Sequence, residues 1–142
     1  MCILAMWGVW RLGQVSVTPA GYSEYAMSAW EVELEPEVRD WYLALDEVFQ
    51  GRVDFRIGQL AEKGSLLGEP HSRQLDGKLR ELRFHLGGRP TRITYWIAPD
   101  RRIILLTVFA KTRRRERRQV ERARKAMERC IAEGHSVEDD DG

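Results

Sequence analysis

Cysteine is scarce in this chain: Cys2 and Cys130 are the only two among 142 residues, and they lie near opposite ends. Two cysteines so far apart form neither a disulfide framework nor the close spacing that metal ligands require. We therefore expect a cytoplasmic protein that uses no metal or other cofactor.

Long apolar runs are also missing. The N-terminal segment MCILAMWGVWRLGQVSV has no basic leading region, and Arg11 interrupts it well short of a membrane span. We predict neither a signal peptide nor a transmembrane helix, and no association with a membrane. Residues 1–26 show no clear hydrophobic period and are interpreted as an extension. A start codon assigned too early, a short extra strand or a partner-contacting arm would each account for it.

The composition is enough for one modest hydrophobic core, with 43% apolar residues, 32% charged residues and five Trp. We expect a single domain over residues 27–133, because the first well-patterned segment follows Met27. The acidic segment 134–142 is expected to remain disordered.

The net charge of +1 conceals a strong asymmetry. Residues 78–129 hold 17 Lys or Arg against 5 Asp or Glu, a net +12, whereas the rest of the chain is acidic. One concentrated basic region in a near-neutral protein indicates a surface that binds a polyanion, with a solvated helix face as the alternative.

Hydrophobic periodicity in the first half predicts one strand and two helices. Apolar residues alternate with acids over residues 30–34, which is typical of a strand buried on one face. A short helix over residues 36–45 begins with proline. Asp46 is expected to cap a second helix that ends at Gly64. The glycine-containing segment 64–77 is interpreted as a loop.

Beyond this loop the period changes to two, which predicts an antiparallel meander. Turn residues separate its three strands, Leu79–His85, Thr91–Ile97 and Arg102–Ala110. A basic helix over about residues 115–132 should dock on the sheet by a stripe formed by Val120, Ala123, Met127 and Ile131. The pattern therefore predicts an α+β domain, with a mostly antiparallel sheet, an N-terminal helical hairpin and a C-terminal helix.

The expected register of the first hairpin places basic side chains together. If residues 87–90 form a four-residue loop, His85 lies opposite Arg92, and Arg83 lies diagonal to Arg92 on the same face of the sheet. The apolar side chains of both strands then lie on the other face.

The second hairpin extends both faces. A tight turn that pairs Ile97 with Arg102 would place Leu106 beside Ile93 on the apolar face. Lys111 should emerge at the rim of the basic face.

Two arginines on one face repel each other unless an anion binds between them. Glu81 is the nearest candidate for an internal ion pair, and an ordinary solvated sheet face is the alternative. If carboxylates lock both arginines, the case for an anion site collapses.

These residue types suit RNA cleavage without a metal, in which the ribose 2′-hydroxyl attacks the adjacent phosphate. Arg83 and Arg92 could bind the phosphate oxygens, since guanidinium groups are planar, forked and permanently charged. His85 is the best candidate for proton transfer, because histidine side chains titrate near neutral pH. Lys111 could act as an acid or as a phosphate anchor.

With this order of elements, residues 29–127 resemble the RelE/ParE toxin superfamily, and the phage-derived HigB-like branch in particular. Three segments carry the resemblance: LDGKLRELRF (75–84), PTRITYW (90–96) and VFAKTRRRERRQVERA (108–123). Three motifs recur among HigB-like proteins: a strand that ends in Leu-x-Glu-Leu-Arg, a strand that opens with Arg, and Phe-x-Lys at the end of the last strand. Arg83, Arg92 and Lys111 occupy these places. The chain departs from the pattern after Lys111, where Thr112 replaces a frequent second Lys and three arginines follow.

The resemblance implies the toxin of a type II toxin–antitoxin system, a ribosome-dependent endoribonuclease (mRNA interferase) with a RelE-like fold. Its expected partners are the ribosome, messenger RNA and a helix-turn-helix antitoxin of the HigA type. We expect RNA contacts from further side chains: Arg80, Trp96, Arg113, Arg114 and Arg115. Two alternatives stay open, a ParE-like inhibitor that binds DNA gyrase and a catalytically inactive relative that only binds its antitoxin or DNA.

Overall fold

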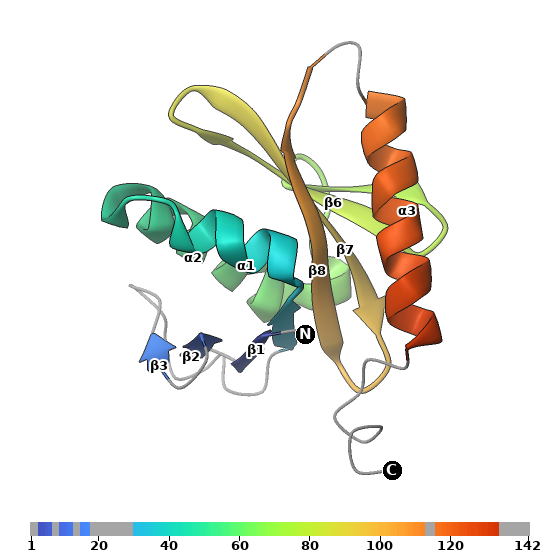
Figure 1. Ribbon diagram of the computed structural model, residues 1–142, viewed down its shortest axis with the longest axis horizontal. Coiled ribbons are helices and arrows are strands. Elements are labelled where there is room, and N and C mark those ends of the chain that lie inside the picture. Colours follow the sequence, from blue (N-terminus) through green and yellow to red (C-terminus); the bar gives the residue numbers. More distant parts are fainter. Residues whose placement is uncertain (1–2, 7–8, 13–14, 18–29, 113–115, 134–142) are drawn as a thin grey trace.

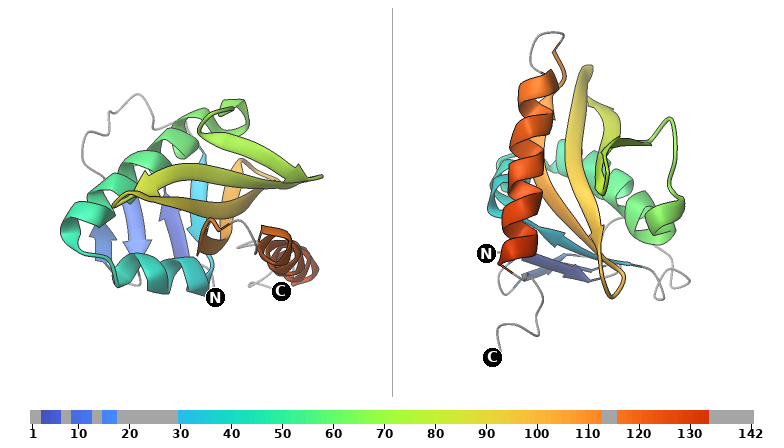
Figure 2. Two further views of the ribbon diagram at one scale, coloured as in Figure 1. Left: turned by 90° about the horizontal axis from the view of Figure 1, so that it is seen from above. Right: turned by 90° about the vertical axis from the view of Figure 1, so that its right-hand side faces the viewer.

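The computed structural model describes residues 3–6, 9–12, 15–17, 30–112 and 116–133. A twisted sheet lies between two layers of helices, with α1 and α2 on one face and α3 on the other (Figures 1 and 2). The strands are β1 (Ile3–Met6), β2 (Val9–Leu12), β3 (Val15–Val17), β4 (Glu31–Leu34), β5 (Ser72–Asp76), β6 (Leu79–Leu86), β7 (Arg89–Ala98) and β8 (Arg102–Ala110). The helices are α1 (Pro36–Leu43), α2 (Glu47–Lys63), the short 3-10 helix η2 (Gly64–Leu66) and α3 (Glu116–Ala132).

The strand order is β3-β2-β1-β4-β8-β7-β6-β5. Every neighbouring pair is antiparallel except β4 and β8, which run parallel. The predicted α+β class and mostly antiparallel sheet are therefore confirmed. Within residues 1–26 the chain forms three short strands that extend the sheet beyond β4, as in the extra-strand alternative.

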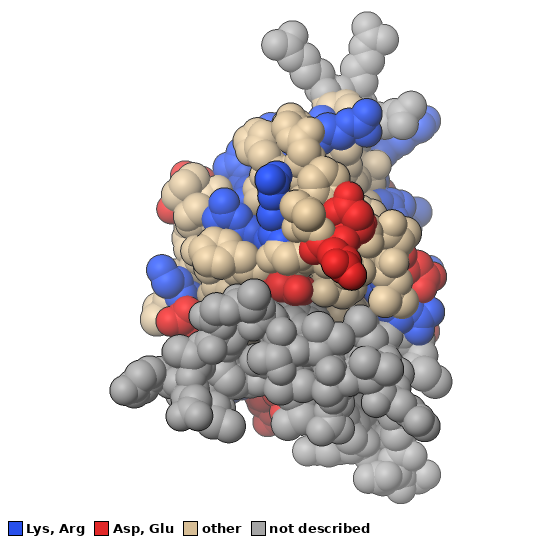
Figure 3. Space-filling view, turned by 90° about the vertical axis from the view of Figure 1, so that its left-hand side faces the viewer, with Lys and Arg blue, Asp and Glu red and all other residues tan. Residues whose placement is uncertain are grey.

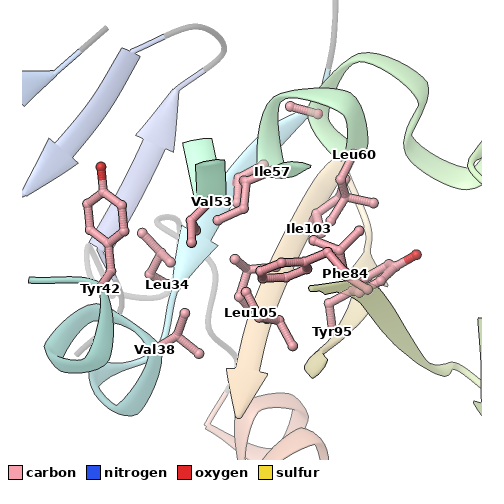
Figure 4. Packing of buried hydrophobic residues seen from close by; sticks show 14 of the residues in the cluster. Leu34, Val38, Tyr42, Val53, Ile57, Leu60, Phe84, Tyr95, Ile103 and Leu105 are labelled. Atoms are coloured by element: carbon pink, nitrogen blue, oxygen red, sulfur yellow. The ribbon is translucent and has the colours of Figure 1, made fainter. Parts of the chain in front are cut away.

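The larger core lies between the sheet and the pair α1 and α2 (Figure 4). Pro36 opens α1, and the carboxylate of Asp46 accepts a hydrogen bond from Phe49 N (2.8 Å), capping α2 as predicted. The helices are joined by a buried hydrogen bond of 2.7 Å that Tyr42 Oη donates to Asp54. No helix among the described residues is both long and apolar enough to cross a membrane.

The smaller core lies under α3. Ala123 and Cys130 are its buried helix residues, and they pack against apolar side chains of β6, β7 and β8. The predicted docking stripe was wrong at its last position, because Ile131 is exposed and Cys130 takes its place. Burial raises the pKa of the Cys130 thiol to about 12, so this side chain is neutral at physiological pH.

The edge strand β5 was not predicted. Residues 72–76 pair with β6 in the segment that was interpreted as a loop. Ser72 faces inward, and its hydroxyl lies 2.5 Å from the hydroxyl of Tyr95, which ties β5 to β7 across β6. This buried polar contact adds to the backbone pairing with β6 in holding a strand that carries little apolar pattern of its own.

The strand β4 is buried on both faces rather than on one. Glu33 turns away from the larger core, and its carboxylate accepts two hydrogen bonds from Arg102, at 2.9 and 3.0 Å. Both side chains are more than nine-tenths buried. The forked geometry of the guanidinium satisfies both carboxylate oxygens, which allows an acid to occupy an interior position.

Candidate functional site

The first hairpin brings Arg83 and Arg92 closer together than predicted. A two-residue turn over Gly87 and Gly88, both at positive φ, replaces the expected four-residue loop. The register therefore shifts by two residues, which preserves the faces but places Arg83 directly opposite Arg92. His85 lies opposite Pro90 instead of Arg92.

The second hairpin also differs from the predicted register. Its connection has three residues rather than four, so Ile97 pairs with Ile103. A β-bulge then places Leu106 and Thr107 on the same face, and Leu106 packs under α3 instead of beside Ile93. After the bulge, Thr107 lies on the predicted face of the sheet, the one that carries Arg92. Its hydroxyl forms a hydrogen bond with the hydroxyl of Thr94, with 2.6 Å between the oxygens.

Glu81 lies between the two arginines on this face. Its Oε1 is 3.8 Å from Nε of Arg83 and 3.8 Å from Nε of Arg92. At these distances each arginine forms an ion pair with Glu81, but the atoms are too far apart for a hydrogen bond. The internal ion pair considered above is therefore present, but one carboxylate is shared by two cations and does not neutralise both.

Burial sets the electrostatics of this group. The side chains of Glu81 and Arg92 are 2% and 7% exposed, whereas that of Arg83 is 26% exposed. Burial raises the pKa of Glu81, and the two guanidinium groups oppose this shift. Burial also lowers the pKa of Arg92, although an arginine stays protonated at physiological pH. Both charged groups are thus less well solvated than in water.

Three polar atoms of this group are buried and make no hydrogen bond within the described chain: Glu81 Oε2, Arg83 Nε and Arg92 Nε. Buried charged groups without hydrogen-bond partners are costly, and native proteins usually satisfy them with water or a ligand. The arrangement can therefore accept a small polar or anionic group next to Arg83, its most exposed member.

Lys111 lies at the rim of this face, as predicted. Its Nζ is 3.9 Å from Oε1 of Glu116 at the start of α3, and its backbone N donates to Pro90 O. Both side chains of the Lys111–Glu116 pair are partly exposed. His85 is exposed and lies two residues along β6 from Arg83, on the same face. We refer to Glu81, Arg83, His85, Arg92 and Lys111 as the basic cluster.

Two predicted RNA-binding residues lie elsewhere. Trp96 is 6% exposed and packs under α3, so it offers no free ring face to a base, and that prediction was wrong. Arg80 projects toward the α1 and α2 side of the sheet, where its guanidinium approaches the Tyr95 hydroxyl and the Leu67 carbonyl. The predictions for Arg113, Arg114 and Arg115, and for the acidic tail 134–142, concern residues outside the described parts of the chain.

A second basic feature was missed by the sequence reasoning. A pocket of about 470 Å³ lies between α2 and the end of β6, and we name it the α2 pocket. Its lining includes Val48, Arg52, Phe55, Arg56, Phe84 and His85. Phe55 was the available signal, because it lies off the apolar stripe of α2 and next to Arg56.

The side of the molecule that carries α1 and α2 is shown in Figure 3. Lys and Arg side chains are spread over its upper part, and Asp and Glu side chains gather near its middle. Within the described ranges, no three His, Cys, Asp or Glu side chains lie close enough together to hold a metal ion. The guanidinium, ammonium and imidazole groups of the basic cluster can support charge stabilisation and proton transfer.

Residues 40–129 match the family described as "Phage derived protein Gp49-like (DUF891)". This match covers more than half of the chain and includes every residue of the basic cluster and of the α2 pocket. No curated protein matched the chain.

Proposed function

Because the chain belongs to the Gp49-like family of phage-derived proteins, which lies within the RelE/HigB-type toxin group, we propose that it is the toxin of a type II toxin–antitoxin system. We propose further that it is a cytoplasmic endoribonuclease that cuts messenger RNA on the ribosome. The family is associated with toxin–antitoxin systems, in which a toxin has an antitoxin partner, and we expect a helix-turn-helix protein in this role.

The observation that carries the nuclease proposal is the direct pairing of Arg83 with Arg92 on one sheet face. The two guanidinium groups outnumber the single carboxylate of Glu81 that lies between them, and Lys111 at the rim is paired with Glu116. This surplus of positive charge suits a phosphate group, whose negative charge grows in the transition state of cleavage.

The proposed reaction needs only groups of the RNA and the protein. The 2′-hydroxyl loses its proton to a base, and its oxygen forms a bond to the adjacent phosphorus. The bond from phosphorus to the 5′-oxygen breaks, and that oxygen takes up a proton, leaving a 2′,3′-cyclic phosphate and a 5′-hydroxyl. We assign phosphate binding to Arg83 and Lys111, and proton transfer to the exposed His85. Arg92, which is buried, adds positive potential behind Arg83.

Cleavage of a defined message on programmed ribosomes tests this proposal. Arg83→Gln should reduce the cleavage rate by about 10²–10³-fold, as expected for loss of one charged donor to a transition state. The matched control Arg39→Gln, a partly exposed arginine of α1 outside the basic cluster, should leave the rate unchanged. Equal cleavage by wild type and Arg83→Gln would refute the assignment.

A second candidate, an inactive relative that only binds its partner, is favoured by one observation. Glu81 lies at ion-pair distance from both arginines, and Arg92 is more than nine-tenths buried. This candidate predicts no cleavage by the wild-type chain and no 2′,3′-cyclic phosphate ends. If growth arrest instead occurs with intact messages and DNA damage, the chain is a gyrase inhibitor.

A further inference from the structure

The α2 pocket lies where the sheet has a free edge. The strand β5 pairs with β6 only as far as Leu82, and the last described contact along this edge is the hydrogen bond from Arg83 N to His71 O. The end of β6 therefore faces the exposed side of α2. Phe84 and His85 contribute to the pocket from this edge.

Arg56 is held in place at the pocket. Its guanidinium carbon lies 5.6 Å from the centroid of the Phe55 ring, and its Nη1 contacts Gln59 (3.1 Å) and Nδ1 of His71 (3.3 Å). Less side-chain entropy is lost on binding when a guanidinium is already oriented. The neighbouring Arg52 lies over the ring of Phe49 at 5.8 Å and is exposed.

The pocket combines apolar rings with positive charge. Phe55 is 56% exposed, so its ring is accessible to a ligand in the pocket. The lining includes Arg52, Arg56 and His85 but no acid. A ligand that suits this combination has a flat, unsaturated body and a negative charge.

We propose that the α2 pocket binds an unpaired nucleotide of the RNA, with its base stacked on Phe55 and its phosphate held by Arg52 and Arg56. This inference rests on the proposed function and extends it to a second contact with the same RNA strand. Bases of any sequence stack on aromatic rings, and the volume of about 470 Å³ lies within the range of small-molecule sites.

His85 connects this pocket to the basic cluster. It lines the pocket and lies two residues from Arg83 along β6. Arg83 lies on the α3 side of the sheet and the pocket lies on the α2 side, so a strand whose phosphate lies at Arg83 would reach the pocket by passing round the free edge of β6 at His85. This continuity favours RNA over the other occupant that suits the charge, an acidic peptide with an aromatic residue.

Binding of a fluorescein-labelled pentauridine, measured by fluorescence anisotropy without ribosomes, tests the inference. Phe55→Ala should weaken binding by about fivefold to a hundredfold, and Phe55→Tyr should preserve it, because stacking needs only the ring. Arg52→Gln should reduce the salt dependence of binding by about one phosphate contact, a change of roughly 0.7 in the slope of log K against log salt. Leu66→Ala, which removes an even more exposed apolar side chain outside the pocket, is the matched control.

The outcome is separate from that of the nuclease test. If Phe55→Ala and Arg52→Gln bind pentauridine like the wild type, the inference is overturned, whether or not Arg83→Gln abolishes cleavage. The inference is also overturned if the wild type does not bind pentauridine, and binding of the peptide Asp-Asp-Phe-Asp-Asp in a Phe55-dependent way would then identify the pocket as a protein-docking site. Photocrosslinking of a 5-iodouridine probe to a peptide of α2 would support the inference that the pocket binds RNA.

Discussion

Breaking the buried pair of Glu33 and Arg102 should destabilise the protein strongly. In Arg102→Met the carboxylate of Glu33 stays buried but loses the two hydrogen bonds, of 2.9 and 3.0 Å, that compensate for its burial. The loss of one partner of a buried pair typically costs about 3–5 kcal/mol, so we expect the free energy of unfolding to fall by about this amount. Glu33→Leu should cost a similar amount, because it leaves Arg102 buried with its charge uncompensated.

Urea denaturation followed by circular dichroism measures these changes, and a double-mutant cycle isolates the pair. The double variant of Glu33→Leu and Arg102→Met should be more stable than either single variant, because no buried charge is left alone. Asp40→Asn is the matched control: the Arg39–Asp40 contact is also 3.0 Å long but is exposed, and its loss should cost less than about 1 kcal/mol. The reasoning would be refuted if the losses of unfolding free energy in the two single variants simply added in the double variant. It would also be refuted if Arg102→Met lost no more stability than the control Asp40→Asn.

Two further predictions concern β6. Burial raises the pKa of Glu81 in the folded state, so its contribution to stability is greatest below its ordinary value near 4.5 and is lost as the pH rises through the folded-state value. The difference in unfolding free energy between wild type and Glu81→Gln should therefore fall from pH 4.5 to 8 in urea titrations, and a difference that rises would contradict this assignment. Gly87→Ala should lower the melting temperature, because φ is +59° and the new Cβ would lie 2.7 Å from Cζ of Phe49. Gly88 is the control, because it is also at positive φ but has no atom within 4 Å of an added Cβ. Gly88→Ala should lose less stability than Gly87→Ala, and an equal loss would show that the contact with Phe49 does not contribute.

Much of the fold followed from periodicity in the sequence. The two N-terminal helices, the Asp46 cap and the three-stranded meander were predicted within a few residues of their observed bounds. These elements are encoded locally, by apolar spacing and by turn residues. The strand β5 was missed because it is mostly exposed and carries little apolar alternation, while its pairing with β6 and its contact between Ser72 and Tyr95 are tertiary features.

The candidate site was predicted in its membership more than in its geometry. Alternation along a strand fixes which face a side chain takes, so Arg83 and Arg92 were expected together. Their direct opposition depends on the length of one turn, and the position of Leu106 depends on a bulge, neither of which the apolar pattern specifies. The burial of Trp96 follows from the docking of α3, which a strand pattern cannot reveal.

The parallel pairing of β4 with β8 bears on when the newly made protein can fold. About 70 residues separate Leu34 from Arg102, which corresponds to about 3 to 14 s of synthesis at 5–20 residues per second. Over the later part of this interval, after Lys63 has been added, a nascent chain holds α1 and α2 without the central strand against which they pack. Completion of the larger core therefore waits until β8 has been made, when about three-quarters of the chain has been translated.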